Sequence, residues 1–405
     1  MARIWPFRGV RYDPARVPSL SAVLAPPYDV ISREEQAALY ARSPYNVVRL
    51  ILPREADRGA AAARTLREWM EAGILVRDPE PAIYFYSQRF RMPDGTEHVR
   101  DGILCRLGLE EFSSGIVRPH ERTFPGPKAD RLALLRATGA HLSPIFGLYA
   151  RPNERLRALA GVAGAPLVDV TMPNGEVHQL WRVVEPGVLR ELQAALAKET
   201  VYIADGHHRY ETGLAYWRER GGGRDAGTIL ACLSNMEEEG LVVLPTHRLV
   251  RPPLRREAAT VVSMLAEHFV VAPWPAHEPR PVGAIDVILP EHRFRVRPKP
   301  GLTATLTECA PVIRELDVAV LHGAILGPIL GASPADLEFT HDDAEAIGAV
   351  VAGRAAAALL VNPPTMAQIR AVCLAGELMP EKSTYFYPKL ADGLVFDLVG
   401  PPWMC

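Results

Sequence analysis

Cysteine is scarce in this chain, with five residues in 405. The cysteines are odd in number and widely spread, and none forms a C-x-x-C pair. Neither a disulfide framework nor a zinc ribbon is therefore indicated. None lies in a motif that would activate a thiol as a nucleophile. A reducing compartment fits this pattern best, and we expect a cytoplasmic protein. The cysteines are Cys105, Cys232, Cys309, Cys373 and Cys405.

Long apolar runs are missing as well. No run reaches the roughly 20 residues that a membrane-spanning helix needs. The first ten residues carry charge but have neither the apolar core nor the cleavage site of a signal peptide. We therefore expect a soluble protein without a membrane partner.

Several familiar motifs are absent. The chain has no G-x-x-x-x-G-K-[ST] and no G-x-G-x-x-G segment, which argues against a P-loop and against Rossmann nucleotide binding. It has no H-E-x-x-H segment, and its adjacent histidines would not easily share a tetrahedral zinc site. The 45 basic and 47 acidic residues nearly balance, so we expect no large basic surface and no nucleic-acid partner.

Lysine is scarce too. Five of the 45 basic residues are lysines and the other 40 are arginines. Since guanidinium groups fill the ordinary surface positions of such a chain, the few lysines are candidates for positions that need a compact ammonium. The alternative is a chance distribution. Three of the five, Lys128, Lys382 and Lys389, lie in motifs described below.

The remaining composition, 48% hydrophobic and 23% charged, is that of a globular protein. The length predicts two or three domains. The mixture of short strands and helices predicts a mixed α/β (α+β) fold. We expect an N-terminal α/β region over residues 1–100, a catalytic core over 101–250 with an insertion at 150–200, and a C-terminal α/β domain over 255–405.

Local signals predict individual elements. The Ser32–Glu35 segment has the pattern of a capping box that opens a helix. Pro93-Asp94-Gly95 and Asn174-Gly175 predict the turns of two β-hairpins. Pro125-Gly126-Pro127 predicts a loop that cannot be helical. A short helix is expected over Asn153–Val162.

The most informative segment is Ile203–Tyr210, Ile-Ala-Asp-Gly-His-His-Arg-Tyr, between an expected strand and an expected helix. Gly206 lets the backbone turn tightly or approach a ligand. The amides and the dipole of a helix start favour an anion, and His207 and His208 add donors. Arg209 can hold a phosphate through two hydrogen bonds. The segment therefore predicts a phosphate-binding site.

Asp205 needs a separate explanation, because a lone carboxylate would repel an anion. One explanation is a Mg²⁺ ion bound beside the phosphates. The other is that Asp205 caps the N-terminus of the helix.

A second set of candidate residues lies at Arg118–Phe124, with Lys128 and Arg131 close behind. Glu121, next to His120, could take the proton of a substrate hydroxyl. The alternative is a surface loop whose charges pair among themselves. The sequence leaves both open.

Two further segments could line a small polar pocket. One is Pro380–Lys389, which would also suit an edge strand with alternating aromatics. The other is Pro245–Arg248, just after a buried strand. Their candidate binding residues are His247, Arg248, Lys382, Ser383 and Thr384.

Five segments together resemble motifs of the domain-of-unknown-function 1015 family, and they run through nearly the whole chain. They are Pro-Pro-Tyr-Asp-Val-Ile (26–31), Pro-Tyr-Asn-Val-Val-Arg-Leu (44–50), Pro-His-Glu (119–121), Asp-Gly-His-His-Arg-Tyr (205–210) and Lys-Ser-Thr-Tyr-Phe (382–386).

The ordered set Pro-His-Glu, Asp-Gly-His-His-Arg and Pro-x-Lys-[Ser/Thr]-Thr is more distantly similar to the free-serine kinases of the ParB/sulfiredoxin-like superfamily. This resemblance implies a ParB/sulfiredoxin-like core, elaborated with an N-terminal region and a C-terminal α/β domain. It implies that Glu121 is the catalytic carboxylate, that Asp205–Arg209 holds the donor phosphates and Mg²⁺, and that Lys382–Thr384 lies near the serine.

The leading prediction is a small-molecule kinase that makes O-phosphoserine from free L-serine, with Mg²⁺ and with ATP, ADP or pyrophosphate as donor. A phosphatase of a small phosphorylated metabolite and a nucleotide-binding regulatory module are the alternatives. A homodimer is left open. The predicted catalytic residues are Glu121, Asp205, His207, His208 and Arg209. The predicted donor site adds Gly206, Lys128 and Arg131, and the predicted acceptor site consists of His120, His247, Arg248, Lys382, Ser383 and Thr384.

Overall fold

The computed structural model describes residues 2–123, 125–150, 164–223, 227–276 and 278–399. The chain forms two compact units. Unit 1 consists of residues 1–119, 123–241 and 388–405, and unit 2 consists of residues 120–122 and 242–387. Both units contain helices and strands, which confirms the expected mixed α/β fold. None of the helices in the described ranges combines the length and apolar character that a bilayer crossing requires.

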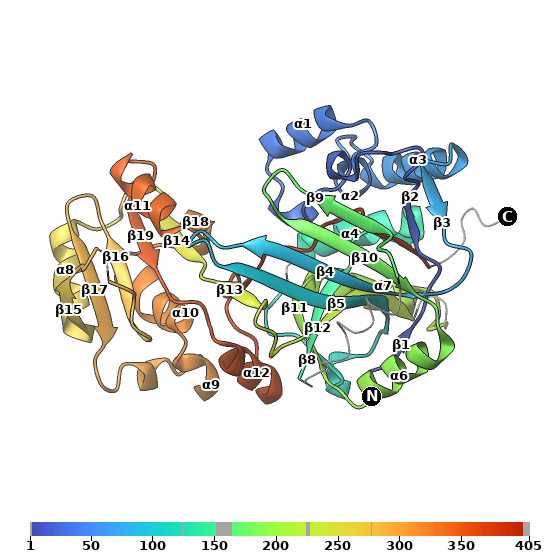
Figure 1. The fold of residues 1–405 in the computed structure, drawn as a ribbon. Helices are drawn as coiled ribbons and strands as arrows, with labels where there is room; N and C mark the ends of the chain where they lie inside the picture. Colours follow the sequence, from blue (N-terminus) through green and yellow to red (C-terminus); the bar gives the residue numbers. More distant parts are fainter. Residues whose placement is uncertain (1, 124, 151–163, 224–226, 277, 400–405) are drawn as a thin grey trace. The chain divides into compact units, whose positions relative to one another are not determined.

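Unit 1 is built on a nine-stranded sheet in the order β6-β11-β8-β12-β5-β4-β10-β9, with β1 paired to β5 (Figure 1). The sheet is mixed, since β6–β11 and β8–β12 are parallel and the other pairs are antiparallel. Its strands are β1 (Ile4–Trp5), β4 (Ile83–Arg91), β5 (Glu97–Gly108), β6 (Val117–Arg118), β8 (Ile145–Tyr149), β9 (Val168–Thr171), β10 (Val177–Val183), β11 (Val201–Asp205) and β12 (Thr228–Asn235). Two small ladders pair β2 (Val10–Tyr12) with β3 (Leu75–Arg77), and β7 (Ala140–His141) with β21 (Asp397–Leu398).

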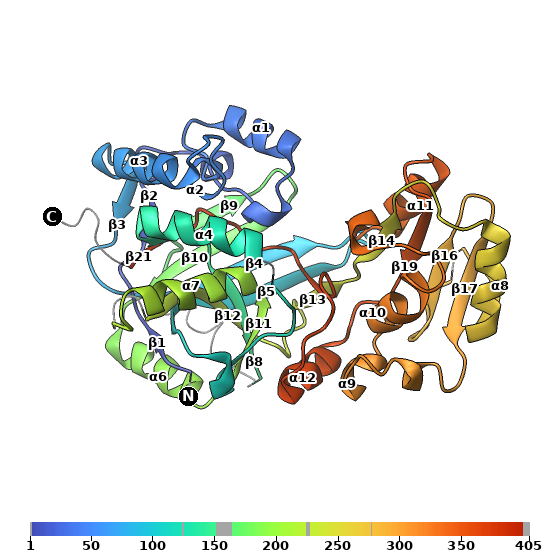
Figure 2. The same cartoon turned by 180° about the vertical axis from the view of Figure 1, so that it is seen from behind.

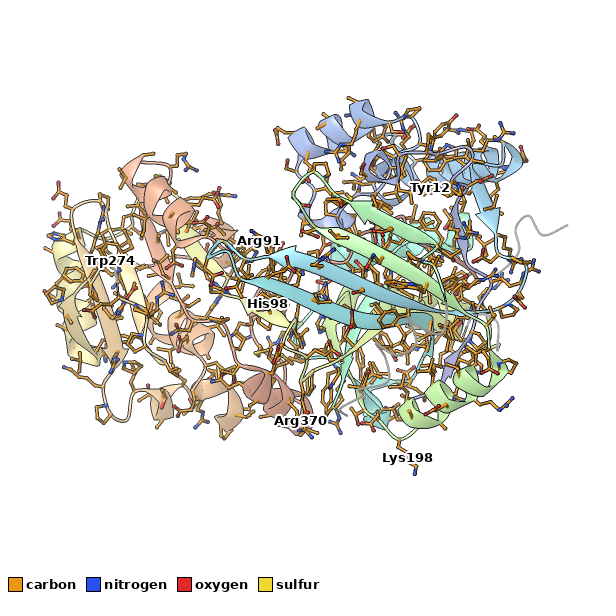
Figure 3. The ribbon with its side chains drawn as sticks, in the orientation of Figure 1. Tyr12, Arg91, His98, Lys198, Trp274 and Arg370 are labelled. Atoms are coloured by element: carbon orange, nitrogen blue, oxygen red, sulfur yellow. The ribbon has the colours of Figure 1, made fainter. Side chains whose placement is uncertain are left out.

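The β4–β5 hairpin spans the expected domain boundary at residue 100. Its register runs from Tyr84 opposite Leu104 to Arg91 opposite Glu97. Arg91 and His98, labelled in Figure 3, mark the turn end of the hairpin. This continuous pairing places residues on both sides of position 100 in one sheet.

Helix α4 of unit 1 lies between two other helices and packs against both α3 and α7. Figure 2 shows α4 and α7 side by side on one face of the sheet, where α7 also packs on β8 and β12. The helices are α1 (Arg33–Arg42), α2 (Val48–Ile51), α3 (Arg58–Glu71), α4 (Pro125–Thr138), α6 (Pro186–Leu196) and α7 (His207–Glu219), with a 3₁₀ turn, η2, at Tyr28–Val30.

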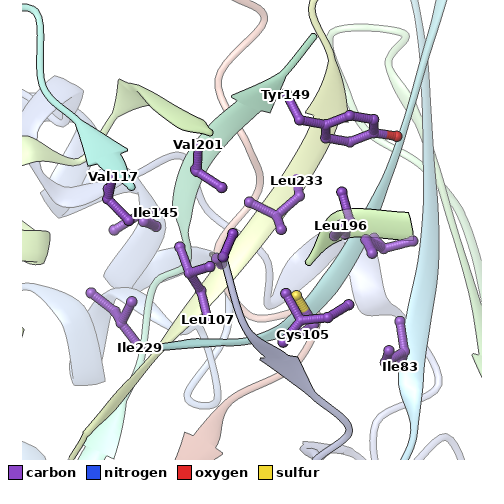
Figure 4. Close-up of a cluster of buried hydrophobic side chains, with 14 of the residues drawn as sticks. Ile83, Cys105, Leu107, Val117, Ile145, Tyr149, Leu196, Val201, Ile229 and Leu233 are labelled. Atoms are coloured by element: carbon purple, nitrogen blue, oxygen red, sulfur yellow. The ribbon is translucent and has the colours of Figure 1, made fainter. Parts of the chain in front are cut away.

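One apolar core of unit 1 gathers side chains from the central strands (Figure 4). Cys105 and Leu107 of β5, Ile145 of β8, Val201 of β11 and Leu233 of β12 are fully buried in it. Burying an aliphatic side chain of this size contributes roughly 1.5–3 kcal/mol to folding. The core thus fixes the position of β11, whose last residue is Asp205.

Most local predictions are confirmed. The Ser32 hydroxyl accepts the Glu35 amide at 3.1 Å and caps α1. Both predicted hairpins are present, as β4–β5 and β9–β10. The loop predicted at residues 125–127 is wrong, because α4 begins at Pro125. The first amides of a helix have no intrahelical partner, so prolines are tolerated there. The helix predicted over Asn153–Val162 lies outside the described residues.

Unit 2 contains an antiparallel six-stranded sheet, in the order β15-β17-β16-β19-β14-β18, and a separate ladder of β13 with β20. The strands are β13 (Val242–Leu244), β14 (His247–Val250), β15 (Phe269–Pro273), β16 (Ile285–Ile288), β17 (Arg293–Pro298), β18 (Leu337–Thr340), β19 (Ala357–Leu360) and β20 (Tyr385–Tyr387). The helices are α8 (Ala258–His268), α9 (Pro311–Arg314), α10 (Asp317–Val320), α11 (Asp343–Val351) and α12 (Met366–Ala375), with a π-helical turn at Leu321–Leu326.

A buried ion network stabilises the sheet of unit 2. Asp286 of β16 accepts hydrogen bonds from Arg295 of β17 and from Arg280. The indole of Trp274, labelled in Figure 3, donates to the same carboxylate at 3.3 Å, and the guanidinium of Arg293 lies over its ring. Because these contacts neutralise Asp286 inside the unit, we assign this network to folding.

The buried side chain of Asn46 supports the segment that precedes η2. Its amide nitrogen donates to the carbonyls of Ala22 and Leu24, and its oxygen accepts the Val48 amide. We expect Asn46→Ala to lower the free energy of unfolding by about 2–4 kcal/mol, because it leaves buried backbone groups without partners. Urea unfolding measures the change. Asn174→Ala, in an exposed hairpin turn, is the control and should cost under about 1 kcal/mol. Equal stabilities of the two variants would contradict this role.

Candidate functional site

Asp205 is the last residue of β11, and the chain turns sharply after it into α7. Gly206 makes this turn with a φ of 89°, a conformation that side chains rarely adopt. A Cβ atom at this position would also lie 3.0 Å from Cζ of Arg209 and 3.1 Å from Ile145. Glycine is therefore required both by the backbone and by the space around it.

The Asp205 carboxylate is the centre of a largely but not fully buried ion cluster in unit 1. Its Oδ1 accepts a hydrogen bond from Nζ of Lys389 at 2.6 Å, and its Oδ2 accepts one from Arg209 at 2.5 Å. Burial acts to raise the pKa of Asp205, but the charges of Lys389 and Arg209 outweigh it and hold the pKa well below its usual range. Asp205 is therefore ionised at any physiological pH.

Both terminal nitrogens of Arg209 donate hydrogen bonds within the protein. One donates to Asp205, and the other donates to the carbonyl of Pro144, in the loop before β8. A phosphate at this helix start would therefore meet a positively polarised helix end and the charges of Arg209 and Lys389, rather than a guanidinium with both ends open.

The N-terminal segment 26–29 reaches the same cluster. The ring of Tyr28 lies under the guanidinium of Arg131, with 4.0 Å between Cζ and the ring centroid. Burial is the main cause that raises the pKa of Tyr28 to about 12, and the charges of Asp29, Arg209, Arg131 and Asp205 also act on it. Tyr28, Arg131 and Arg209 line one cavity of about 50 Å³.

The segment after Lys389 ties these parts together. Asp392 exchanges backbone hydrogen bonds with Ala25, directly before the 26–29 segment. Its side chain is 1% exposed, and its Oδ2 accepts the Ser143 hydroxyl at 2.5 Å. Its other oxygen, Oδ1, has no hydrogen-bond partner among the described residues. Burial raises the pKa of Asp392 to about 7, although Arg209 and the Ser143 hydroxyl act in the opposite direction.

Most of the remaining residues predicted to bind the phosphate donor make hydrogen bonds to other groups of unit 1. Nζ of Lys128 donates to Glu211 of α7 at 2.7 Å, and the Thr123 hydroxyl donates to the other oxygen of that carboxylate. Arg131 donates to Asp130 and to the carbonyl of Ile51. His207 is buried at the start of α7, and His208 beside it is half-buried.

Glu121 belongs to unit 2, where the segment after Pro380 holds one of its oxygens. Oε1 accepts the amides of Ser383 at 3.1 Å and Thr384 at 2.9 Å, and the Thr384 hydroxyl at 2.8 Å. Nε2 of His120 lies 2.8 Å from the same hydroxyl. Since that hydroxyl donates to Glu121, it can accept from His120. Oε2 accepts no hydrogen bond from any described residue.

Arg248 holds the turn that carries these donors. Its guanidinium is fully buried and donates to the carbonyls of Glu381 and Lys382, each at 3.1 Å. Burial lowers the pKa of Arg248 to about 10, although the charge of Glu121 acts to raise it. Lys382 has a φ of 54° and is the only residue other than glycine with a positive φ in the described part of the chain.

His247 lies elsewhere in unit 2. Its Nε2 is 2.6 Å from the Asp343 carboxylate, and its Nδ1 accepts the Val361 amide. Neighbouring residues of a strand point to opposite faces, so His247 and Arg248 of β14 face different surroundings.

The candidate residues thus fall into two sets. Unit 1 brings together Asp205 and Arg209 with two residues that were absent from the predicted site, Lys389 and Asp392. Unit 2 brings together His120, Glu121, Arg248 and Lys382–Thr384. Two sequence signals indicated Lys389, the scarcity of lysine and its place in the Pro380–Lys389 segment, whereas no signal indicated Asp392. The described residues hold no group of three or more His, Cys, Asp or Glu side chains that could bind a metal.

Comparison with known proteins gives a family and a weak structural likeness. The model of the family described as "Protein of unknown function (DUF1015)" matches residues 4–319. No curated protein matches the chain. Several solved structures are similar at low identity, among them the following three. A free serine kinase in complex with AMP has a TM-score of 0.36 and 14% identity, covering 70% of this chain and 86% of that one. A conserved hypothetical protein from Pyrococcus furiosus has a TM-score of 0.37 and 15% identity, and the match covers 73% of this chain and 95% of that one. SbnI from Staphylococcus aureus, with a C-terminal truncation, has a TM-score of 0.38 and 14% identity, and the match covers 73% of this chain and 87% of that one. TM-scores of this size assign no activity to the chain.

We expect Asp392→Asn to stabilise the protein at alkaline pH. The raised pKa means that between about pH 4 and pH 7 the unfolded chain loses a proton that the folded chain keeps, so the wild type loses stability as the pH rises through this window. About three pKa units correspond to at most about 4 kcal/mol. Urea unfolding should show the variant more stable at pH 8 and close to the wild type at pH 4. A variant less stable than the wild type at pH 8 would rule out this account.

We expect Lys382→Gly to raise the free energy of unfolding by about 0.5–1 kcal/mol. Glycine relieves the strain of a positive φ, partly offset by its greater freedom in the unfolded chain. Lys382→Ala, which removes the ammonium but keeps Cβ, is the matched control and should show no such gain. Urea unfolding of both variants measures the difference. Equal stabilities of the glycine and alanine variants would mean that position 382 stores no strain.

Proposed function

We propose that this chain, which belongs to the DUF1015 family of proteins of unknown function, is a phosphotransferase that makes O-phosphoserine from free L-serine. The observation that carries the proposal is the Glu121 carboxylate, which accepts three hydrogen bonds at one oxygen and none from the described residues at the other. A fixed carboxylate of this kind suits a general base for a hydroxyl.

Glu121 would take the proton of the serine hydroxyl through Oε2. The amides of Ser383 and Thr384 orient the carboxylate, and His120 supports it through the Thr384 hydroxyl. Such support matters because a base acts only when it lies within hydrogen-bonding distance of the proton it removes.

The start of α7 in unit 1 would bind the phosphate donor, which is ATP, ADP or pyrophosphate. The helix dipole, Lys389 and Arg209 supply positive charge, and Gly206 allows the close approach of a ligand. The imidazoles of His207 and His208 would add donors at the same helix end. The role of this set is to neutralise and position the phosphates, which is the main task in phosphoryl transfer.

Magnesium would be bound chiefly by the donor. Both oxygens of Asp205 are occupied by Lys389 and Arg209, so the carboxylate has little capacity left for a metal ion. Mg²⁺ usually keeps several waters and binds substrate phosphates with one or two carboxylates, which fits this arrangement. The ion would supply further neutralisation of the phosphate charge.

The proposed reaction has a simple balance. The serine hydroxyl loses its proton to Glu121, and its oxygen forms a bond to the terminal phosphorus of the donor. The bond between that phosphorus and the leaving oxygen breaks, which releases AMP from ADP, ADP from ATP, or phosphate from pyrophosphate. In this scheme Arg248 acts on the reaction only by holding the 381–384 turn.

The test is the formation of O-phosphoserine from L-serine with ATP, ADP or pyrophosphate in the presence of Mg²⁺, measured by ³¹P NMR. We expect product with at least one donor, and Glu121→Gln should lower kcat by about 10²–10⁴-fold, because the amide cannot accept the proton. Glu377→Gln, a partly exposed residue after α12, is the control and should keep the wild-type rate.

Folded wild-type protein that forms no phosphoserine with any donor would refute the proposal. Release of inorganic phosphate from phosphoserine without an acceptor would point to a phosphatase instead. Tight nucleotide binding without turnover, unchanged in Glu121→Gln, would point to a regulatory module.

A further inference from the structure

Asp392 differs from two other buried acids of unit 1 in the groups that surround its carboxylate. The comparable acids Asp78 and Asp397 are each paired with an arginine, Arg11 and Arg106. Among the described residues, the Asp392 side chain accepts a hydrogen bond only from the neutral Ser143 hydroxyl, and its other oxygen accepts none. A buried carboxylate without a cation is costly, which makes this position unlike an ordinary structural acid.

The charges around Asp392 belong to the proposed donor site. They come from four places: Arg209 in α7, Asp205 at the end of β11, Asp29 in η2, and Lys389 in the segment of Asp392 itself. Arg209 and Lys389 are already paired with Asp205. The cavity wall next to this cluster adds Ser143, Tyr28, Arg131 and His141.

The protonation of Asp392 therefore changes the balance of charge at the start of α7. The charge of Arg131 is offset by its partner Asp130. With Asp392 ionised, the three carboxylates of Asp29, Asp205 and Asp392 then exceed the two cations Arg209 and Lys389. With Asp392 protonated, carboxylates and cations are equal in number, and the helix dipole tips the site towards anions. A change of charge on a buried group alters the binding of a nearby ion strongly, because screening inside a protein is weak.

We propose that Asp392 sets the anion affinity of the site at the start of α7, which binds an anion strongly when Asp392 is protonated and weakly when it is ionised. Asp392 is thus a positioning and charge-setting residue rather than a catalytic one. The inference rests on the proposed function only for the identity of the anion as a phosphate donor.

The pKa of Asp392, raised by burial to about 7, places this change near neutral pH. By linkage, an anion that prefers the protonated form raises the pKa of Asp392 further, so anion binding takes up protons. Donor affinity should fall as the pH rises through 7. The product of a phosphoryl transfer would then leave more readily on the alkaline side.

The test uses inorganic sulfate, whose charge is constant between pH 6 and pH 8. Its affinity for the full-length protein is measured by calorimetry at constant ionic strength, for the wild type and for Asp392→Asn. We expect equal affinities at pH 6. At pH 8 the wild type should bind about five- to tenfold more weakly than the variant, since the amide stays neutral. Dividing the wild-type affinity by that of Asp392→Asn at each pH removes the contribution of His141, His207 and His208, which both proteins share.

Two further variants sharpen the result. Asp78→Asn, a buried acid paired with Arg11 and Tyr84, is the matched control, and its sulfate affinity should follow that of the wild type at both pH values. Ser143→Ala removes the hydrogen bond that favours the ionised form of Asp392. The midpoint of the affinity change should therefore move to higher pH.

A ratio of wild-type to Asp392→Asn affinity that is the same at pH 6 and pH 8 would overturn the inference, as would weaker binding by the variant at pH 6. The assay contains no serine and no phosphoryl donor. A failure to form phosphoserine therefore leaves this result intact, and an unchanged ratio leaves the proposed reaction intact.

Discussion

The ion cluster around the Asp205 carboxylate is the interaction on which the arrangement of unit 1 depends. Lys389 and Arg209 each donate to one oxygen, so the end of β11, the start of α7 and a segment 184 residues later in the chain are fixed to one another. Arg209 extends the contact to Pro144, and Asp392 extends it to Ser143 and Ala25. Separating any of these segments from the others would leave a charge of the cluster without its partner, which would raise the free energy of the folded protein strongly.

The parts of this structure that the sequence predicted are those set by local chemistry. The Ser32 cap, the two hairpins and the strand–turn–helix at Asp205–Arg209 each depend on residues a few positions apart. Glu121 and Lys382–Thr384, which are far apart in the sequence, were grouped by the resemblance to known motifs rather than by local chemistry, and they lie together in unit 2. Loop prediction at residues 125–127 was wrong for a local reason as well, because the first turn of a helix tolerates prolines that its interior excludes.

The partners of Asp205 and Arg209 could not be predicted in the same way. Lys389 and Ser143 are far from them in the sequence, and no periodic pattern links residues at such separations. Lys389 had a compositional signal in the scarcity of lysine, but its neighbours 380–387 belong to unit 2 and Lys389 itself belongs to unit 1. The sequence therefore grouped Lys382 and Lys389, whereas the boundary between the units falls between them. Asp392 carried no signal, because an isolated Asp before a glycine is typical of an ordinary turn.

Both units keep features that oppose stability at the positions proposed to act on substrates. Lys382 holds a positive φ in the turn that orients Glu121, and Asp392 holds a carboxyl group with a raised pKa beside the cluster of Asp205. Replacements that relieve these costs are simple, since glycine would suit position 382 and an uncharged amide would suit position 392. A chain selected for stability alone would be expected to carry them. The residues that lower stability lie at the candidate donor and base sites, whereas the acids Asp78 and Asp397 are paired with arginines. This is the pattern expected where function opposes stability.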